Sequence, residues 1–168
     1  MTDVAVAEAP APELLHGCPV TYSRGQKTVH VAKAGYLKLV GALKADGYHM
    51  LIDLVAVDYL ATNDRDLGDT VGERYEVVAN LLSHSLAARV RVRVQLAADA
   101  PHVASLYDLY PGAEAMEREA YDLVGIIFDG HPDLSRILLP DGWEGHPLRK
   151  DYATGRIPVQ FKAAPQPR

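Results

Sequence analysis

The clearest pattern of apolar and polar positions lies at residues 89–96. Four apolar residues alternate there with four polar ones, Val90, Val92, Val94 and Leu96 with Arg89, Arg91, Arg93 and Gln95. A side-chain period of two puts the apolar residues on one face, so this segment predicts a strand with one buried face. Residues 73–82 predict a second strand, and the short link at 83–88 makes the two strands a hairpin.

Apolar residues elsewhere predict three more strands and three helices. Strands are expected at 28–32, 48–60 and 126–128, and helices at 34–46, at 101–110 and from after Gly112 to about Val124. The strand at 48–60 is apolar on both faces, which is typical of the middle of a sheet. Gly47 and Gly125 are expected to end the first and last helices in a left-handed conformation. The buried stripes of those two helices are expected to be Tyr36, Leu37, Val40 and Leu43, and Met116, Ala120, Leu123 and Val124.

These elements predict an α+β fold with two layers, a mixed and mostly antiparallel sheet with helices on one face, followed by an extended C-terminal segment. Three parts are expected along the chain. Residues 1–20 contain three prolines and no periodicity, which predicts a flexible lead-in. Residues 21–140 form the folded domain, and residues 141–168, rich in glycine and proline, form an extended tail that binds a partner.

Composition narrows the function classes. The chain has 168 residues and a formal net charge of −5, which disfavours nucleic acid because phosphate binding needs a basic face. Its single cysteine, Cys18, excludes an intrachain disulfide and disfavours a protein-held iron–sulfur cluster or Cys-rich zinc site. No apolar run approaches the roughly 18 residues of a membrane span, and the N-terminus lacks a signal-peptide pattern. The chain is therefore expected to be cytosolic, or held at a membrane only through a partner.

Charged residues on the predicted strands have structural readings beside functional ones. The arginines of the 89–96 strand form either a docking patch or a solvated face that acids such as Glu76 partly neutralise. Asp53 and Asp58 lie five residues apart on one strand and so point to opposite faces, which excludes a shared-proton pair unless the strand is bulged. We expect Asp53 to be hydrogen-bonded in the fold and Asp58 to mark the end of the strand.

The last predicted helix carries a run of charges. Glu114, Arg118 and Asp122 are spaced four residues apart, which places the arginine between two acids on one helix face. Glu117 and Glu119 are about 200° apart around the helix and cannot act together on one substrate. The helix charges therefore give no acid/base pair.

Two histidines allow a metal site as an alternative. His131 and His146 each lie in a Gly-His-Pro triplet, with acids nearby at Asp133, Asp141, Glu144 and Asp151. Zinc or iron is one interpretation, but the fifteen-residue spacing lacks a helical HxxxH or HExxH arrangement. The other interpretation is that these histidines cap turns or meet a partner. No nucleotide-binding loop, nucleophile elbow or Cys–His arrangement is present.

Three linked motifs in the C-terminal third resemble one family. They read E-R-E-x-x-D at 117–122, G-H-P-D-L-x-R-I-L-L-P at 130–140 and W-E-G-H-P-L-R-K-D-Y at 143–152. Together they resemble the C subunit, the 30 kDa-type subunit of respiratory complex I (NADH:quinone oxidoreductase). The chain departs from that pattern at Ala115 and Met116, where the family has an aromatic residue, at Val124 in place of phenylalanine, and at Ser135 in place of a basic residue.

The resemblance implies a role. It implies a non-redox structural subunit of the peripheral arm, without a catalytic centre or cofactor of its own, in a proton-pumping complex that carries NADH, FMN, iron–sulfur clusters and quinone. It implies packing against the D subunit near the quinone site, at the cytoplasmic face of the inner membrane. The alternatives are the equivalent subunit of a membrane-bound hydrogenase, an F420H2 dehydrogenase or a ferredoxin-dependent photosynthetic complex, and, in another class, a free-standing metal-dependent enzyme that uses His131 and His146.

The motif residues are expected to form the partner interface. This expected interface comprises Glu117, Arg118, Glu119, Asp122, His131, Arg136, Trp143, His146, Arg149, Lys150 and Asp151. Within it, Arg149, Lys150 and Asp151 are expected to anchor the extended tail on the partner. No residue is expected to be catalytic or to bind a metal or cofactor.

Overall fold

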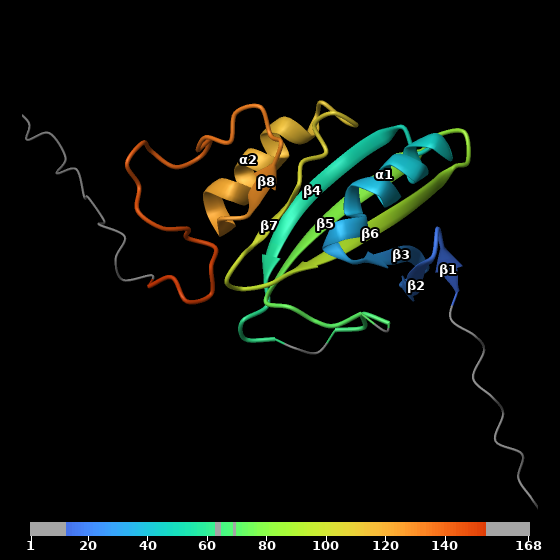
Figure 1. Cartoon of the computed structure of the whole chain (residues 1–168), viewed down its shortest axis with the longest axis horizontal. Coiled ribbons are helices and arrows are strands. Elements are labelled where there is room, and N and C mark those ends of the chain that lie inside the picture. Colours follow the sequence, from blue (N-terminus) through green and yellow to red (C-terminus); the bar gives the residue numbers. More distant parts are fainter. Residues whose placement is uncertain (1–12, 63–64, 69, 154–168) are drawn as a thin grey trace, which may run out of the picture.

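A computed structural model describes residues 13–62, 65–68 and 70–153. Within these residues eight strands and two α-helices follow one another along the chain (Figure 1). In order they are β1 (Leu14–Leu15), β2 (Cys18–Ser23), β3 (Gln26–Val31), the 3-10 turn η1 (Lys33–Gly35), α1 (Tyr36–Ala45), β4 (Met50–Asp58), β5 (Tyr75–Ser83), β6 (Ala88–Leu96), β7 (His102–Ala104), α2 (Ala113–Val124) and β8 (Ile127–Asp129).

Six of the strands form one mixed sheet in the order β1-β2-β3-β6-β5-β4. Every neighbouring pair is antiparallel except β3 and β6, which run parallel. The predicted hairpin is β5 and β6, with Val77 opposite Val94. β7 and β8 form a separate parallel pair. The expected mixed, mostly antiparallel sheet is confirmed.

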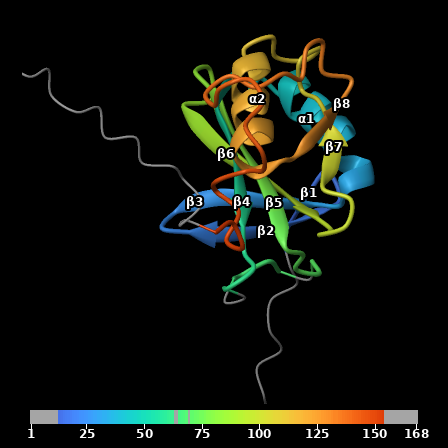
Figure 2. The same ribbon diagram turned by 90° about the vertical axis from the view of Figure 1, so that its left-hand side faces the viewer.

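Both helices lie on the same side of the sheet (Figure 2). The apolar face of β6 packs there, with its three valines fully buried. On α1, Tyr36, Val40 and Leu43 are buried as predicted, but Leu37 is exposed and Leu39 takes its place in the core. On α2, Ala120 and Val124 are buried, and Met116 and Leu123 pack against the core. The α+β fold with helices on one face is therefore confirmed.

The strand predicted for the middle of the sheet lies at its edge instead. β4 has only β5 as a neighbour in the sheet. Two of its apolar side chains, Ile52 and Val55, are exposed, so β4 is not buried on both faces. Asp53 is also exposed and its side chain makes no hydrogen bond within the described residues, so the expectation that the fold binds it was wrong. β4 ends at Asp58, as predicted.

The prediction of a helix at 101–110 was wrong. Residues 102–104 form β7, which pairs with β8 and places the buried Val103 opposite Phe128. A short turn follows, in which Tyr110 donates its N–H to the carbonyl of Leu106 at 2.7 Å. The strand on which Phe128 lies was predicted correctly, but its pairing partner comes from the segment that was predicted to be helical.

In the described part of the chain, no helix is long and apolar enough to cross a bilayer.

Candidate functional site

Most of the predicted interface residues lie around the C-terminal half of α2, and Asp122 is at their centre. The Oδ2 atom of Asp122 accepts the backbone N–H groups of Ile137, Leu138 and Leu139 at 3.1, 2.8 and 2.8 Å. Its Oδ1 atom accepts Nη1 of Arg136 at 2.7 Å. Burial acts to raise the pKa of this carboxyl, but the N–H groups and the guanidinium outweigh burial and lower the pKa to about 2. Asp122 is therefore an ionised group that holds the segment at 136–139.

Two arginines complete the attachment of this loop to α2. Arg136 also donates to the carbonyl oxygens of Trp143 at 2.8 Å and Gly145 at 3.1 Å. Arg118 donates to the carbonyl and hydroxyl of Ser135 and to the carbonyl of Arg136, at 3.1, 2.9 and 2.9 Å. The arginine predicted to lie between two acids on the helix thus binds the loop instead, because the loop offers it three part-buried oxygen acceptors.

Glu117 and Glu119 point in different directions, as the helical geometry predicts. Glu117 is fully buried and accepts the hydroxyl of Ser105 at 2.6 Å and the N–H of Leu106 at 2.7 Å. Burial raises the pKa of its carboxyl. Glu119 is exposed. Glu117 therefore fastens α2 to the turn after β7, and Glu119 is the acid that this helix presents to solvent.

The structure does not bring the two histidines together. Nε2 of His131 lies 3.0 Å from the carbonyl oxygen of Glu114, and Nδ1 of His146 lies 2.9 Å from that of Asp122. These carbonyls are eight residues apart on α2, roughly 12 Å at 1.5 Å per residue. Burial lowers the pKa of His146. Among residues 13–62, 65–68 and 70–153, no group of three His, Cys, Asp or Glu side chains is placed to hold a metal.

The segment after His146 lies along the chain's own domain. Leu148 donates its N–H to the carbonyl of Leu123 at 2.9 Å, and Arg149 donates Nε to that of Val124 at 2.7 Å. The guanidinium of Arg149 also lies over the ring of Tyr75, 5.4 Å from its centroid. Through these contacts the first part of the predicted tail, residues 141–153, packs against α2 and the sheet.

The next two residues reach the end of β4. The N–H of Lys150 donates to Oδ2 of Asp58 at 2.8 Å, and Asp151 pairs with Arg74 at 2.9 Å. Arg74 in turn binds both oxygens of the buried Asp58, at 3.0 and 2.9 Å, and these contacts lower the pKa of Asp58 to about 2 although burial opposes them. Sequence reasoning missed this cluster. Its only signal was an aspartate at the end of a largely apolar strand.

Two motif glycines lie where a side chain does not fit. Gly125 ends α2 with φ of 81°, and a Cβ there would come within 2.5 Å of Arg149 Nη2 and 2.6 Å of His146 Cδ2. Gly145 has φ of 85°, and a Cβ there would lie 2.8 Å from the ring of Tyr152. Only glycine adopts such φ values without strain, so the predicted left-handed end of α2 is confirmed and the glycines allow the motif segments to pack closely.

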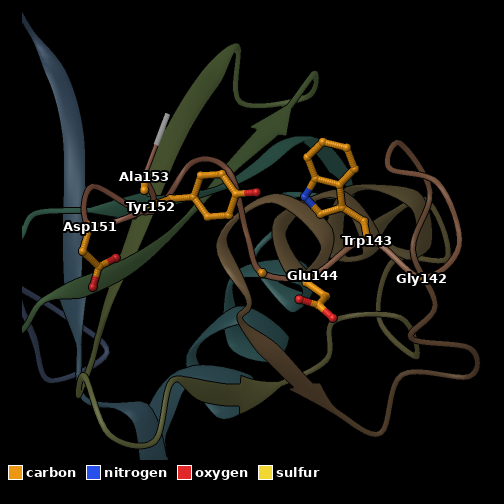
Figure 3. Close-up of a pocket in the computed structure, with 7 residues that line it drawn as sticks. Gly142, Trp143, Glu144, Asp151, Tyr152 and Ala153 are labelled. Carbon is orange, nitrogen blue, oxygen red and sulfur yellow. The ribbon is translucent and has the colours of Figure 1, made fainter. Parts of the chain in front are cut away.

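Trp143 lies at an open hollow of about 660 Å³ (Figure 3). The lining residues come from two short stretches, 142–145 and 151–153. The indole Nε1 of Trp143 is buried and has no hydrogen-bond partner in the described structure. The residues that follow Ala153, the rest of the predicted tail, lie outside the described residues.

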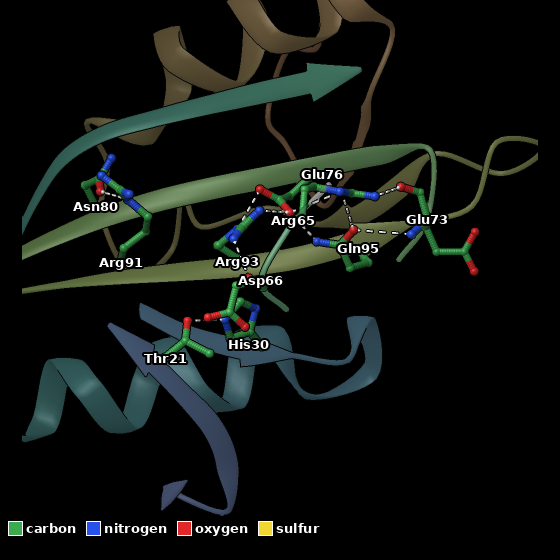
Figure 4. A network of polar contacts seen from close by, with 10 residues as sticks. All are labelled: Thr21, His30, Arg65, Asp66, Glu73, Glu76, Asn80, Arg91, Arg93 and Gln95. Atoms are coloured by element: carbon green, nitrogen blue, oxygen red, sulfur yellow. Dashed lines mark hydrogen bonds and ion pairs between the residues drawn. The ribbon is translucent and has the colours of Figure 1, made fainter. Parts of the chain in front are cut away.

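Two of the alternating arginines of β6, Arg91 and Arg93, form hydrogen bonds within the fold, and Figure 4 shows both side chains. Arg93 binds both oxygens of Glu76 at 2.8 Å, as the cross-strand interpretation predicts. Arg91 donates to the side-chain oxygens of Asn80 at 3.1 Å and Gln26 at 2.8 Å. Side chains of neighbouring strands thus bind both arginines, which favours the structural interpretation over the docking patch.

The loop between β4 and β5 contributes to the same network. Arg65 lies 3.5 Å from Glu76 and donates to Gln95 at 3.0 Å, and Gln95 also binds Glu76. Arg65 and Glu76 are almost inaccessible to solvent. The burial of Arg65 depends on Glu76 and Gln95, which lie on the neighbouring strands β5 and β6.

Large apolar side chains remain exposed beside the charged site. They are Ile127, Ile137, Leu138 and Leu148. The three N–H groups that Asp122 binds belong to residues 137–139, so this carboxylate holds the backbone from which Ile137 and Leu138 project. Several charged motif residues are thus bound inside the chain, and four large apolar side chains are exposed beside them.

Comparisons with known proteins connect this arrangement to a family. The family model described as "Respiratory-chain NADH dehydrogenase, 30 Kd subunit" matches residues 29–157. The C subunit of the NADH-quinone oxidoreductase of Saccharopolyspora erythraea is 42% identical over 151 residues, 88% of this chain and 57% of that protein. Proteins of the same name from Acidothermus cellulolyticus and Roseiflexus castenholzii are 38% and 40% identical over 98% and 95% of this chain, and 82% and 87% of theirs. The chain thus spans under two thirds of the first relative and over four fifths of the other two.

Two solved structures share the fold. A trypsin-resistant fragment of Nqo5 matches with a TM-score of 0.64 and 34% identity, over 71% of this chain and 91% of the fragment. A chain from a membrane-bound sulfane sulfur reductase, described as an archaeal respiratory membrane complex, matches with a TM-score of 0.68 over 95% of this chain and 92% of that one. Its 21% identity shows a common fold and no more.

Proposed function

This chain belongs to the family of the 30 Kd subunit of respiratory-chain NADH dehydrogenase, and from that premise we propose that it is the C subunit of a proton-pumping NADH:quinone oxidoreductase. In this role it is a non-redox structural subunit of the peripheral arm. The match to the family model over residues 29–157 carries the proposal. NADH, FMN, iron–sulfur clusters and quinone belong to other subunits of the complex, and this chain lies at the cytoplasmic face of the membrane through its partners.

We further propose that the chain packs against the D subunit, near the quinone site, through the loop that Asp122 holds. Exposed apolar patches rimmed by polar residues mark interaction sites, and Leu138 in this loop is 60% exposed. The ionised Asp122 and the two arginines keep the loop in one conformation, which lowers the entropy lost when it binds. On this proposal the motif charges act as positioning residues, and the apolar side chains make the contact.

The sequence-derived interface divides accordingly. Six of its residues hold the loop and the segment after it against α2 and the core through the contacts described above. They are Glu117, Arg118, Asp122, Arg136, His146 and Arg149. Trp143 lies at the hollow formed by residues 142–145 and 151–153, and its buried Nε1 has no hydrogen-bond partner in the described structure.

A matched pair of substitutions tests the interface. Leu138 and Leu86 are similarly exposed, at 60% and 54%, but Leu86 lies in the turn between β5 and β6. With an affinity tag on the full chain and membranes solubilised in mild detergent, Leu138→Asp is expected to reduce the amount of copurified D subunit about tenfold or more, as for an interface residue worth over roughly 1.4 kcal/mol. Leu86→Asp is expected to leave it unchanged. Equal recovery with both variants contradicts the interface.

The same eluate tests the complex itself. Oxidation of NADH by the eluate supports the proposed enzyme, and oxidation of hydrogen without NADH activity identifies the equivalent subunit of a hydrogenase instead. The fold does not choose between these machines, because a chain of a sulfane sulfur reductase complex shares it. An eluate that contains no membrane subunits contradicts the proposed function.

A further inference from the structure

The edge strand β4 leaves a short stretch of backbone without a strand partner in the described part of the chain. A bulge interrupts its pairing with β5 between Leu51 and Asp53, and pairing is regular from Asp53 to Asp58. The far end of the strand is occupied by Lys150, whose N–H binds Asp58. The regular edge between these two features covers residues 53–57.

A small apolar hollow lies along this edge. It is formed by Leu54, Val55 and Ala56 of β4, by Leu123 and Val124 of α2, and by Leu148. Its volume is about 130 Å³. A cavity of roughly 150 Å³ accommodates a benzene molecule, so this hollow has the size of one apolar side chain.

Each face of this edge carries one exposed carboxylate. Glu119 lines the hollow from α2. Asp53 faces the other side of the sheet, where it lies in a shallow hollow with Glu76, Arg91 and Arg93. Both are exposed, and within the residues that the structure describes neither takes part in an ion pair or a side-chain hydrogen bond. Four further acids of β4, β5 and α2, namely Asp58, Glu76, Glu117 and Asp122, are bound inside the fold. The β4 edge therefore has an apolar hollow and one exposed acid on the face toward α2, and a second exposed acid on the opposite face.

The chemistry of the edge selects an extended strand as the ligand. An edge strand presents unpaired N–H and C=O groups, and proteins usually protect such edges with lysine, proline or a covering segment. β4 contains neither lysine nor proline, and its bulge and the Lys150 contact protect only its ends. An added strand would satisfy the row of backbone groups at 53–57, and no helix or small molecule does so along its length.

We propose that the groove between β4 and α2 binds an extended, basic segment of a neighbouring polypeptide, which adds a strand to β4. Side chains alternate along a strand, so one apolar residue of this segment enters the hollow beside Leu54 and Leu123. Its sequence neighbours face the other side of the sheet, where a lysine or arginine pairs with Asp53. A second basic residue, two positions from the apolar one, lies near Glu119. The inference rests on the proposed function in taking the neighbour to be another subunit of the same complex.

Photo-crosslinking in the intact complex tests this directly. The full chain carries p-benzoylphenylalanine in place of Val55, and a matched chain carries it in place of Leu86, which is also exposed but lies in the β5–β6 turn. After irradiation of membranes, the complex is purified and the crosslinked peptides are identified by mass spectrometry. The expected product at position 55 is a segment of a different subunit that has a lysine or arginine within two residues of an apolar residue. The chain with the probe at position 86 is expected to give no crosslink to that segment.

A charge reversal supplies the second arm. Glu119→Lys is expected to reduce the yield of the position-55 crosslink about tenfold, since an attractive pair becomes a repulsive one. Asp99→Lys, at an exposed acid beyond β6, is expected to leave the yield unchanged. Equal yields in both variants overturn the proposed charge complementarity and with it the proposal.

The remaining outcomes also decide the matter. A crosslink to a second copy of this chain, to its own residues 154–168 or to an acidic segment overturns the proposal, and so does the absence of any crosslink in a complex that copurifies normally. In those cases the subunit assignment stands, because copurification is measured on the same sample. Failure of the chain to copurify with any membrane subunit contradicts the proposed function instead.

Discussion

Replacing Asp122 by asparagine removes a negative charge from a site without solvent access and keeps the volume of the side chain. In the native chain Oδ2 accepts three backbone N–H groups and Oδ1 accepts the guanidinium of Arg136. The asparagine amide has one acceptor oxygen. Whichever way it turns, its NH2 group faces donors, either the N–H groups of residues 137–139 or Arg136.

The expected loss follows from two independent magnitudes. A pKa of about 2 in place of the ordinary 3.8 corresponds to about 2.5 kcal/mol of stabilisation of the ionised form. Removing one partner of a buried ion pair costs roughly 3–5 kcal/mol. We therefore expect Asp122→Asn to lower the free energy of unfolding by about 3 kcal/mol.

Urea unfolding of the full chain measures this loss. Circular dichroism reports the whole fold, and fluorescence reports the loop, because Trp143 is the single tryptophan and its carbonyl binds Arg136. Glu119→Gln, at an exposed site on the same helix, is expected to change stability by less than about 0.5 kcal/mol. A loss below roughly 1 kcal/mol in Asp122→Asn, or an unchanged environment of Trp143, would refute the reasoning.

The pH dependence of the free energy of unfolding provides a second test of the role of Asp122. The pKa of Asp122 is lower in the folded chain than in the unfolded one, so its contribution is complete above the unfolded value near 4. It is lost as the pH falls toward about 2. Asp122→Asn should remove this part of the acid-induced loss, and the two chains should converge in stability at the acid end.

Further substitutions probe the packing of the motif segment. Gly125→Ala should lower the free energy of unfolding by about 2–4 kcal/mol, measured by urea or thermal unfolding, because alanine is strained at a φ of 81° and its Cβ displaces Arg149. Gly142→Ala, at a φ of 79° with open space around it, should lower it by only about 1–2 kcal/mol. Equal losses would show that the close approach is unimportant. Arg74→Ala should cost about 3–5 kcal/mol by leaving the buried Asp58 without its ion pair, and it should raise the pKa of Asp58 from about 2, so that acid unfolding begins at higher pH; an unchanged acid transition would contradict this.

Local signals in the sequence predicted several elements correctly. The alternation on β6 and the apolar stripe on α2 depend only on neighbouring residues, and so does the glycine that ends α2, since its φ is a property of one residue. The resemblance of the motifs at 117–152 to one family likewise needed no coordinates, and the family match confirms it.

Two elements show where local signals fail. β4 is apolar on both faces, which is common to a central strand and to an edge strand whose outer face meets a partner. Residues 102–104 are too few to carry a period, and their pairing with β8 overrides the helical pattern expected from Pro101 to Tyr110. For residues 102–104 the deciding contact comes from a segment distant in sequence. For β4 the edge position follows from the order of the other strands in the sheet.

The sequence by itself determined which residues alternate, where α2 ends and to which family the chain belongs, because these depend on local spacing and on the order of residues. Only the tertiary structure decided what the charges do. Arg118 turns from its helical neighbours to Ser135, Asp122 binds the loop at 137–139, and Asp58 binds Arg74 and Lys150. A buried charged side chain pairs with whichever polar groups the tertiary fold brings next to it. When those groups lie on another segment, the residue spacing along a helix does not identify them.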